Sequence, residues 1–583
     1  MPLSESLLQV RNLAYSYDGG QSPVLSGVNL DVGEGELVLF CGPTGSGKTT
    51  LALCLNGLVP YATGGDLSGT VRIGDVDVPE TPTPHVATEV GLVFQDPEGQ
   101  LCTLFLEDEI AFGAENLLVP RSELAERVNH MLEFIGLQDA RQDSVFELSG
   151  GQKQKVNVAS VLAMQPRLLV LDMPTANLDP VGSAEVFGVI RRLVSEGVTT
   201  CIVIENRLDD LVPLADRVVV MGLGGRIAYD GTPTEVFAQG RDIVERLGVE
   251  IPQLVELTLA LQERGCDLDG GQGLPLTVEE TATRIEAQIK AGKLWVHERL
   301  PVEAAPATVG AAPIVEMEDV RFSYRRGEEV LKGVSFQMQQ GELLAIVGNN
   351  GSGKTTLVKQ LVGLLHPSAG RARVCGLEVS RSTLAEISTK VAYVFQYPEH
   401  QFVAQGQTVY DEVAFNLRMA DYPDAEIEAR VTELIAMFGL EGKEETSPFE
   451  LSGGEMRALS VACMLSMYPE LLILDEPNYG QDRRRIAALM ARLDDLRAGG
   501  TSVIMITHDM RLVAEYATSA LLLSNGELLF HGLPEELFER TDLLARAALK
   551  EPPVCAVVRE LCQRGLELPP GITTVSAFLD AVV

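Results

Sequence analysis

Basic residues, aromatic residues and long apolar runs are all scarce in this sequence. Among its 583 residues, 46 lysines and arginines stand against 82 aspartates and glutamates, and aromatic residues make up 5% with a single tryptophan. The formal net charge of -36 repels the phosphates of nucleic acids and the anionic cytoplasmic leaflet of a membrane. We therefore expect no nucleic-acid partner and a soluble, acidic surface.

Paired cysteines and hydrophobic targeting segments are also missing. The nine cysteines form no C-x-x-C pair, and the N-terminal MPLSESLLQV lacks a basic stretch followed by an apolar core. This usage indicates a reducing cytosol. No window approaches the roughly 18 apolar residues of a membrane-spanning helix, since even VVVMGLGG is interrupted by glycines after Met221. We expect any membrane role to depend on a separate subunit.

What the sequence does contain is one long unit that occurs twice. GPTGSGKTT from Gly42 matches GNNGSGKTT from Gly348, and LSGGQ from Leu148 matches LSGGE from Leu451. The similarity extends to PQLVELTLALQERG and PPVCAVVRELCQRG, each followed by a threonine-led helix start. The repeat therefore predicts two copies of one domain, each with a helical tail. The Ala/Pro-rich residues 301–313 are expected to form an extended linker.

Each copy contains the motif G-x-x-x-x-G-K-[ST] between a strand pattern and a helix pattern. Glycines allow backbone N–H groups to close around phosphates, the lysine reaches the outer phosphates, and the hydroxyl binds Mg²⁺. The order of strand, glycine loop and helix predicts a parallel α/β sheet. The residues expected to contact ATP are Gly42, Gly45, Ser46, Gly47, Lys48, Thr49 and Thr50 in the first copy, and Gly348, Gly351, Ser352, Gly353, Lys354, Thr355 and Thr356 in the second. Of these, Thr49 and Thr355 are expected to be metal ligands.

Each copy also has a short apolar strand pattern that ends in a carboxylate. LLVLD ends at Asp172 and LLILD ends at Asp475. In a fold with a glycine loop of this kind, such an aspartate holds Mg²⁺ through water. We expect both aspartates to be metal ligands.

The LSGGQ and LSGGE segments are expected to precede helices that begin near Gln152 and Glu455. A capping box, in which the serine caps the helix and the third residue after it reaches back, accounts for Ser149 and Ser452. It does not account for the two glycines after each serine, which leave backbone amides open to an anion. The residues expected to contact nucleotide here are Ser149, Gly150, Gly151, Gln152, Ser452, Gly453 and Gly454.

At this point both halves resemble the nucleotide-binding subunits of ATP-binding cassette (ABC) transporters, for which LSGGQ is the signature. The resemblance covers nearly the whole chain and implies an α/β fold of two tandem P-loop domains, each with a helical signature subdomain and a small C-terminal helical tail. It implies an ATPase that uses ATP and Mg²⁺ for transport. We predict nucleotide-binding domains at residues 1–246 and 313–547, helical tails at 247–290 and 548–583, and a linker at 291–312.

The resemblance also implies roles for two residues that occupy matching positions in both halves. An aromatic residue that stacks on adenine corresponds to Tyr17 and Tyr324. A glutamine that senses Mg²⁺ and the membrane partner corresponds to Gln95 and Gln396.

The family pattern further implies a general base after the aspartate strand and a switch histidine after the next strand. The second half has both, as Glu476 and His508. The first half has Met173 and Asn206, and neither side chain can perform the corresponding proton chemistry.

Cassettes of this family bind ATP between two domains paired head to tail. Applied here, the pattern places Met173, Asn206 and Glu455 in one composite site with Lys48. The other site combines Lys354, Asp475, Glu476 and His508 with LSGGQ of the first half. We therefore expect one degenerate site that binds ATP and one site that hydrolyses it.

The segments FQDPEGQ and FQYPEHQ, together with the repeated helical tail, resemble the ATPases of energy-coupling factor (ECF) importers. That resemblance implies uptake of a vitamin or a transition-metal ion, with a transmembrane coupling protein and a membrane-embedded substrate-binding protein as partners. It also implies a peripheral location at the cytoplasmic face of the membrane. Two alternatives stay open: a fused ATPase of a sugar-type ABC importer, and a soluble ABC protein that acts on translation. The cargo, the identity of the partners and any higher oligomeric state are not encoded in recognisable motifs.

Overall fold

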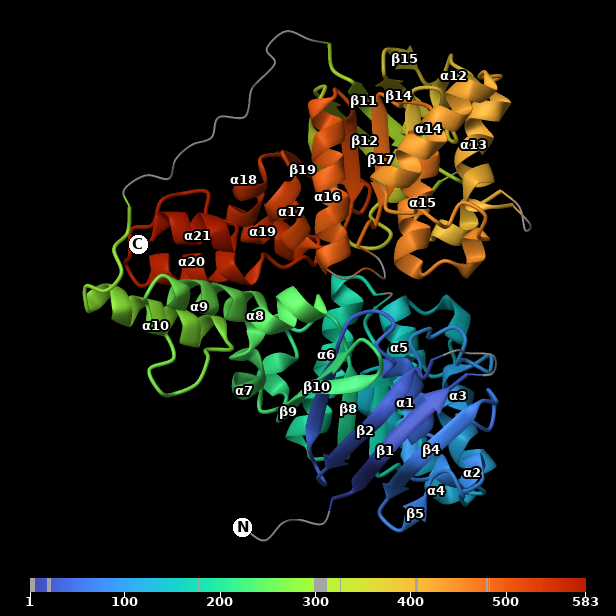
Figure 1. Cartoon of the computed structure of the whole chain (residues 1–583), viewed down its shortest axis with the longest axis vertical. Helices are drawn as coiled ribbons and strands as arrows, with labels where there is room; N and C mark the ends of the chain where they lie inside the picture. Colours follow the sequence, from blue (N-terminus) through green and yellow to red (C-terminus); the bar gives the residue numbers. More distant parts are fainter. Residues whose placement is uncertain are drawn as a thin grey trace. The chain divides into compact units, whose positions relative to one another are not determined.

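The chain folds into two compact units, Met1–Leu294 (unit 1) and Trp295–Val583 (unit 2). The computed structural model describes residues 6–17, 22–176, 178–297, 312–325, 327–403, 407–478, 481 and 483–582. Most of the linker expected at residues 291–312 therefore lies outside the described residues. The repeat predicted from the sequence is visible in Figure 1 as the same order of elements in the blue-to-green half and the yellow-to-red half.

Unit 1 is built on a six-stranded sheet in the order β10-β9-β3-β8-β7-β6. All neighbouring strands are parallel except β9 and β10, which are antiparallel. Four of the strands are buried along their whole length because their sequences are mostly apolar and are covered on both faces. The strands are β3 (Leu37–Cys41), β6 (Val90–Val93), β7 (Leu168–Asp172), β8 (Thr200–Ile204), β9 (Arg217–Gly222) and β10 (Arg226–Gly231).

A second sheet in unit 1 is antiparallel and was not predicted from the sequence. Its strands have the order β2-β1-β4-β5, and buried and exposed positions alternate along much of β1 because only one face meets the core. The strands are β1 (Leu8–Ser16), β2 (Leu25–Val32), β4 (Asp66–Ile73) and β5 (Val76–Asp77).

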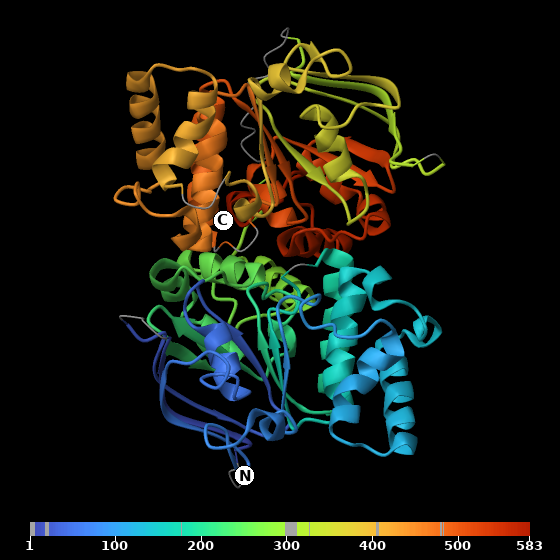
Figure 2. The same ribbon diagram turned by 90° about the vertical axis from the view of Figure 1, so that its right-hand side faces the viewer.

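The helices of unit 1 divide into those that cover the sheets, a subdomain of three, and a tail. The subdomain consists of α3 (Leu106–Asn116), α4 (Arg121–Ile135) and α5 (Gly150–Ala163), and stands beside the sheets in Figure 2. The tail pair is α9 (Gln253–Glu263) and α10 (Val278–Lys290), and Thr277 caps α10 as the threonine-led pattern predicts. The remaining helices are α1 (Lys48–Leu55), α2 (Thr83–Val86), α6 (Pro180–Ser195), α7 (Pro233–Phe237) and α8 (Gly240–Asp242), with one π-helical turn at Ile243–Leu247.

Unit 2 repeats this plan. Its larger sheet has the order β16-β17-β18-β13-β19-β20, and its antiparallel sheet has the order β12-β11-β14-β15. The strands are β11 (Val315–Phe322), β12 (Leu331–Met338), β13 (Leu343–Val347), β14 (Ala369–Val374), β15 (Leu377–Glu378), β16 (Val391–Val394), β17 (Leu471–Asp475), β18 (Ser502–Ile506), β19 (Ser519–Ser524) and β20 (Glu527–Gly532). The helices are α11 (Lys354–Leu361), α12 (Leu384–Ser388), α13 (Val409–Met419), α14 (Asp424–Met437), α15 (Gly453–Leu465), α16 (Arg483–Ala498), α17 (Met510–Tyr516), α18 (Pro534–Glu539), α19 (Thr541–Arg546), α20 (Pro553–Gln563) and α21 (Val575–Ala581).

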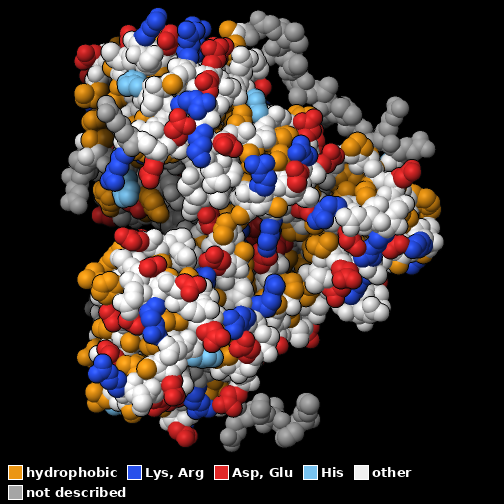
Figure 3. Space-filling model, turned by 180° about the vertical axis from the view of Figure 1, so that it is seen from behind, with side chains coloured by type: hydrophobic (Ala, Val, Ile, Leu, Met, Phe, Trp, Pro, Cys, Tyr) orange, Lys and Arg blue, Asp and Glu red, His pale blue; other side chains and the backbone are white. Residues whose placement is uncertain are grey.

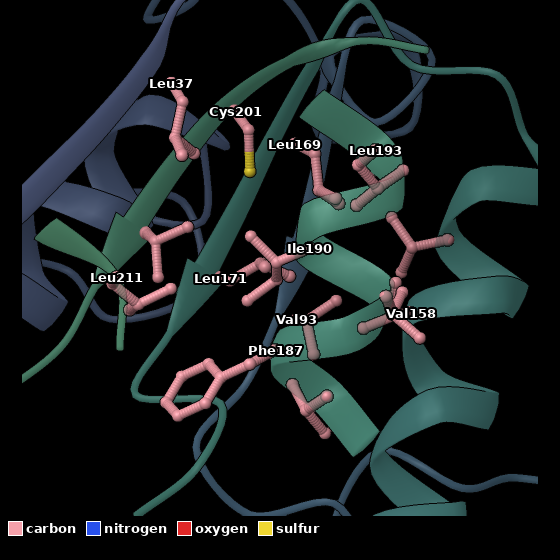
Figure 4. Packing of buried hydrophobic residues seen from close by; sticks show 14 of the residues in the cluster. Leu37, Val93, Val158, Leu169, Leu171, Phe187, Ile190, Leu193, Cys201 and Leu211 are labelled. Atoms are coloured by element: carbon pink, nitrogen blue, oxygen red, sulfur yellow. The ribbon is translucent and has the colours of Figure 1, made fainter. Parts of the chain in front are cut away.

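The core of unit 1 lies on both sides of the larger sheet. Alternate residues of β3 point to opposite faces, so that Leu39 joins one apolar cluster and Phe40 joins the other. In Figure 4, Ile190 and Leu193 of α6 pack beside Leu169 and other side chains of the sheet. Replacing a fully buried side chain such as Ile190 with alanine is expected to cost about 2–5 kcal/mol. This packing fixes the strand ends from which the candidate site is built.

The surface mixes charges of both signs. On the face shown in Figure 3, acidic and basic side chains lie interspersed among uncharged ones. No helix in the described part of the chain has both the length and the apolar content needed to span a membrane.

Candidate functional site

The glycine loop of unit 1 connects β3 to α1, and its lysine is held inside the loop. Nζ of Lys48 donates to the carbonyl oxygens of Gly42 at 2.7 Å and Pro43 at 3.0 Å. Burial lowers the pKa of Lys48. Gly45 has a φ of 80°, and the position where its Cβ would stand is open. A side chain would therefore be strained here and would occupy the space that a phosphate needs.

The glycine loop of unit 2 has the same geometry. Nζ of Lys354 donates to the carbonyl oxygens of Gly348 at 2.7 Å and Asn349 at 2.9 Å. Both loops lead directly into helices of eight residues, α1 and α11, which begin at the lysines. The predicted residues Ser46, Thr49, Thr50, Ser352, Thr355 and Thr356 all lie on these loops or in the first helical turn. Each unit thus presents lysine, hydroxyl and backbone N–H groups at one helix N-terminus.

The two candidate adenine-stacking tyrosines lie next to these loops. The hydroxyl of Tyr17 is 3.2 Å from Oγ1 of Thr50, and the hydroxyl of Tyr324 is 3.2 Å from Oγ1 of Thr356. Each ring also makes an edge-to-face contact with the aromatic residue two positions earlier, Tyr15 or Phe322. The rings are partly exposed, which leaves a face free for a planar ligand.

Asp172 and Asp475 lie at the carboxyl ends of β7 and β17, as expected. Both are buried, and burial raises the pKa of each carboxyl. Within the described part of unit 1, Oδ1 of Asp172 is buried and has no hydrogen-bond partner. A buried carboxylate oxygen without a protein partner, close to a threonine hydroxyl, fits the oxygen ligands that Mg²⁺ prefers.

Glu476 follows β17 and His508 follows the neighbouring strand β18, so that the two side chains meet at the ends of these strands. Nδ1 of His508 lies 2.8 Å from Oε1 of Glu476, and the hydroxyl of Thr507 donates to Oε2 of Glu476 at 3.4 Å. Glu476 has a φ of 45°, an uncommon conformation for a residue other than glycine. The geometry therefore places the predicted base and the predicted switch histidine in one hydrogen-bonded pair.

The corresponding segment of unit 1 has the same backbone conformation but lacks this hydrogen-bonded pair. Met173 has a φ of 48°, and its side chain packs against the apolar cluster that contains Phe40. Its N–H donates to the carbonyl of Ile204 at 2.9 Å, as that of Glu476 does to Ile506. Asn206 makes a backbone hydrogen bond to the carboxylate of Glu205 at 2.8 Å. The first site therefore has no side chain at position 173 that could accept a proton.

Glu205 is a buried carboxylate that the sequence motifs did not reveal. Its oxygens accept from the N–H of Thr175 at 3.1 Å, from the hydroxyl of Thr175, and from the N–H groups of Asn206 and Arg207 at 2.8 and 3.3 Å. It stands where unit 2 has Thr507. Each unit thus has a carboxylate where two neighbouring strands end. It is Glu205 at the ends of β7 and β8 in unit 1, and Glu476 at the ends of β17 and β18 in unit 2.

Unit 2 has two further groups around its strand end that sequence reasoning missed. The hydroxyl of Tyr393 donates to Oδ2 of Asp475 at 2.7 Å, and the buried Arg457 donates to the carbonyl oxygens of Asp475 and Glu476 at 2.7 and 2.6 Å. The repeat gives Leu92 and Gln154 at the matching positions of unit 1. An alignment of the two halves could have found both differences.

The signature segments form capping boxes in both units. Ser149 and Ser452 cap helices in which Gln152 and Glu455 reach back to the serine N–H at 2.9 and 2.8 Å. The helices begin at Gly150 and Gly453, two residues before the expected starts near Gln152 and Glu455, because a capping serine makes the next residue the first of the helix. Glu455 therefore performs the same capping role as Gln152.

The second signature glycine of unit 1 has a packing role as well. A Cβ on Gly151 would lie 2.5 Å from the Cα of Gly182 in α6, so that only glycine permits this helix contact. The matching glycine of unit 2 is also crowded, since a Cβ on Gly454 would clash with Nη1 of Arg485. Close packing of the helix is therefore a second reason for glycine at position 151, beside the predicted contact with nucleotide.

Gln95 and Gln396 follow the ends of β6 and β16, beside the aspartate strands β7 and β17. The loops that begin with them are fixed by the second glutamine of each motif. Oε1 of Gln100 accepts from the N–H of Phe94 at 3.0 Å, and Oε1 of Gln401 accepts from that of Phe395 at 3.3 Å. Gln95 is exposed and Gln396 is half-buried.

The segment after Gln100 presents apolar side chains. The buried carboxylate of Glu109 accepts from the N–H groups of Cys102 and Thr103 at 3.0 and 2.7 Å. Beyond this anchor, Leu104 and Phe105 are exposed, with 64% and 43% of their surface accessible. A fixed loop that exposes large apolar side chains is typical of a binding surface.

A protein-family model described as "ABC transporter" matches residues 25–176 and 331–479. A "Putative ABC transporter ATP-binding protein" of Methanosarcina mazei is 38% identical over 99% of this chain and 98% of its own length. A "Putative HMP/thiamine import ATP-binding protein YkoD" of Bacillus subtilis is 37% identical over 95% of this chain and 96% of its own length. A solved structure is titled as cbiO1 from Clostridium perfringens, part of the ABC transporter complex cbiONQ. It is 29% identical to this chain with a TM-score of 0.38, and the match covers 42% of this chain and 99% of the cbiO1 chain.

Proposed function

This chain belongs to the ABC transporter family, whose ATP-binding subunits hydrolyse ATP, and we propose that it energises an importer of the ECF type through one hydrolytic and one degenerate ATP site. The observation that carries the asymmetry is the hydrogen-bonded pair of Glu476 and His508, against Met173 and Asn206 in unit 1.

In the proposed mechanism, each glycine loop binds the phosphates of ATP with backbone N–H groups and its lysine. Mg²⁺, held by Thr355, Asp475 and Gln396 in one site and by Thr49, Asp172 and Gln95 in the other, would neutralise charge on the phosphates. Glu476 accepts a proton from the attacking water, and His508 orients the carboxylate through the hydrogen bond at 2.8 Å. Loss of such a base costs about 10² to 10⁴ in rate, so that the Met173 site binds ATP without comparable turnover.

The family resemblance supports a head-to-tail pairing in which each ATP meets the glycine loop of one unit and the signature of the other. Under this pairing the hydrolytic site uses LSGGQ from residues 148–152, and the degenerate site uses LSGGE from residues 451–455. The helical tails are proposed to assist the pairing.

Three observations support an ECF-type importer as the complex. The motif F-Q-x-P-x-x-Q occurs twice, and in both units its last glutamine fixes the loop. Exposed apolar residues such as Leu104 and Phe105 follow it and suit a helix of a membrane partner. The similar YkoD protein is named a putative HMP/thiamine import ATP-binding protein. The proposed partners are a transmembrane coupling protein and a membrane-embedded substrate-binding protein, which would hold this chain at the cytoplasmic face of the membrane.

The test of the hydrolytic site compares ATP turnover of the native chain with that of Glu476→Gln. We expect turnover to fall by about 10²-fold or more while ATP binding is retained. Asn206→Gln is the control. It also introduces a glutamine, but in the proposed degenerate site, and it leaves the proposed base in place. Retention of most of the steady-state rate by Glu476→Gln would contradict the assignment.

The test of the complex is purification of the tagged chain from detergent-solubilised membranes of its own host. Recovery with a multi-span coupling protein supports the importer, whereas recovery with ribosomes or with the membrane subunits of a sugar transporter contradicts it. A maleimide probe then maps the contact. Docking on the loop after Gln100 should slow the labelling of the exposed Cys102 and leave Cys562, in α20, as the internal reference.

A further inference from the structure

Arg457 of α15 is a buried cation that binds four backbone carbonyl groups. Its Nη2 donates to the carbonyl oxygens of Asp475 at 2.7 Å and Glu476 at 2.6 Å. Its Nη1 donates to the carbonyl oxygens of Phe395 and, at 3.4 Å, Gln396. Only 3% of the residue is exposed.

These contacts join three segments that have separate roles in the proposed function. Arg457 stands five residues after the signature serine Ser452. Asp475 and Glu476 are the proposed metal ligand and general base, and Gln396 opens the loop proposed to face the membrane partner. The planar, rigid guanidinium fixes the distances among all three segments, which a flexible side chain with fewer donors cannot do.

The position of this charge is costly for the protein. Burial lowers the pKa of Arg457 to about 10, which still leaves it charged at neutral pH. A buried cation is retained at a net benefit only when its surroundings satisfy it or when it fixes one particular arrangement. Here Arg457 binds the carbonyl group of Glu476, the residue whose backbone has a φ of 45°.

Unit 1 provides an internal comparison. The matching residue is Gln154, whose Nε2 reaches a single carbonyl, that of Phe94, at 3.4 Å. Its Oε1 is buried without a hydrogen-bond partner among the described residues. The unit that lacks the general base therefore also lacks the four-carbonyl contact.

We propose that Arg457 is a positioning residue that sets the conformation of Glu476 and couples it to the Gln396 loop and the signature helix. This inference rests on the proposed role of Glu476. A displacement of α15 or of the Gln396 loop changes the position of the base through one side chain.

The test is Arg457→Gln, which installs the side chain found in unit 1. We expect kcat for ATP hydrolysis to fall by about 10- to 100-fold, as for a reactive group displaced by about 1 Å. The KM for ATP should change less than about threefold, because the glycine loop is untouched. Arg457→Lys should recover part of kcat, since it restores the charge and some of the donors.

Arg430→Gln is the matched control. Arg430 is also buried in unit 2, but its hydrogen bonds go to Glu433 and to the carbonyl of Leu465 at the far end of α15, not to the Gln396 loop or the Asp475–Glu476 segment. Its loss should lower thermal stability and leave kcat within about twofold. An equal fall of kcat in both variants would overturn the proposal, because the effect would then be general loss of packing.

A double variant separates this inference from the proposed function. If Arg457 acts through Glu476, adding Arg457→Gln to Glu476→Gln should leave the residual single-turnover rate unchanged. A further fall of about tenfold in that rate would overturn the inference alone. An active Glu476→Gln single variant would overturn the proposed function itself, and an unchanged kcat in folded Arg457→Gln would overturn only the role of Arg457.

Discussion

Met173 and Glu476 have the same backbone conformation at matching positions of the two units, with φ values of 48° and 45°. Each N–H group donates to the last residue of the neighbouring strand at 2.9 Å. The left-handed conformation is strained for both side chains and persists only where the surrounding structure imposes it. Unit 1 therefore has the backbone geometry that unit 2 has at its proposed base, while the Met173 side chain packs against the apolar core.

This relationship predicts that a carboxylate alone will not restore hydrolysis in unit 1. In a Glu476→Gln background, Met173→Glu should leave turnover at the background level, because position 206 holds asparagine where unit 2 has the histidine that pairs with Glu476. Met173→Glu combined with Glu205→Thr and Asn206→His reproduces the set of unit 2 and should raise turnover by about tenfold or more. Steady-state phosphate release measures both. Equal rates in the single and triple variants would contradict the prediction.

The head-to-tail pairing predicts unequal effects of the same substitution in the two signatures. Ser149→Arg should reduce turnover by about 10²-fold, because the segment that it blocks is proposed to face the hydrolytic site. Ser452→Arg removes an equivalent capping serine but should leave more of the turnover, because its segment is proposed to face the degenerate site. The matched caps make the two variants comparable in folding cost. A larger loss from Ser452→Arg would contradict the pairing.

The positions of the glycine loops and the strand-end aspartates could be predicted from the sequence because they depend on residues that are close together in the chain. Lys48 and Gly42 are six residues apart, and their contact at 2.7 Å follows from the loop motif. The antiparallel sheets could not be predicted in the same way, because the pairing of β1 with β4 joins residues about 60 positions apart without a motif.

The buried charged residues around the strand ends were missed for a related reason. Arg457 and Asp475 are separated by 18 positions, and the carbonyl contact between them has no sequence signature. The buried state of Glu205 depends on Thr175, which lies 30 positions earlier. Comparison of the two halves marks such positions as different, but only the fold gives the reason.

The four hydrogen bonds to Glu205 predict a structural role that stability measurements can test. Glu205→Ala should lower the free energy of unfolding of unit 1 by about 1–3 kcal/mol, because it leaves the buried N–H group of Thr175 and the part-buried N–H group of Asn206 without this acceptor. Glu196→Ala is the control, since the Glu196 side chain makes an exposed helical ion pair with Arg192 and the substitution should change stability by less than about 0.5 kcal/mol. Urea denaturation measures both, and equal effects would contradict the role of Glu205.

Glu455 predicts a pH dependence with a defined sign. Hydrogen bonds from the backbone and side chain of Ser452 lower the pKa of Glu455. Its contribution is thus fully present above the unfolded-state pKa of about 4.3 and is lost as the pH falls through the lower pKa of the folded state. Glu455→Gln keeps the capping hydrogen bond without this titration. The stability difference between native chain and variant should therefore shrink between pH 6 and pH 3, and a difference that grows would contradict the prediction.

The burial of the cysteines predicts which thiols react in the folded chain. Of the nine free cysteines, only Cys102 and Cys562 are exposed. Burial raises the pKa of Cys41 and Cys201 to about 12, which removes the reactive thiolate at ordinary pH. A disulfide-exchange reagent at pH 8 should thus titrate two thiols rapidly and all nine after denaturation. In Cys102→Ser/Cys562→Ser the rapid phase should disappear, while ATP turnover stays unchanged because neither thiol lies on a glycine loop or a strand end. A third rapid thiol in the native chain would show that one of the buried segments opens, and would contradict the packing described for that segment.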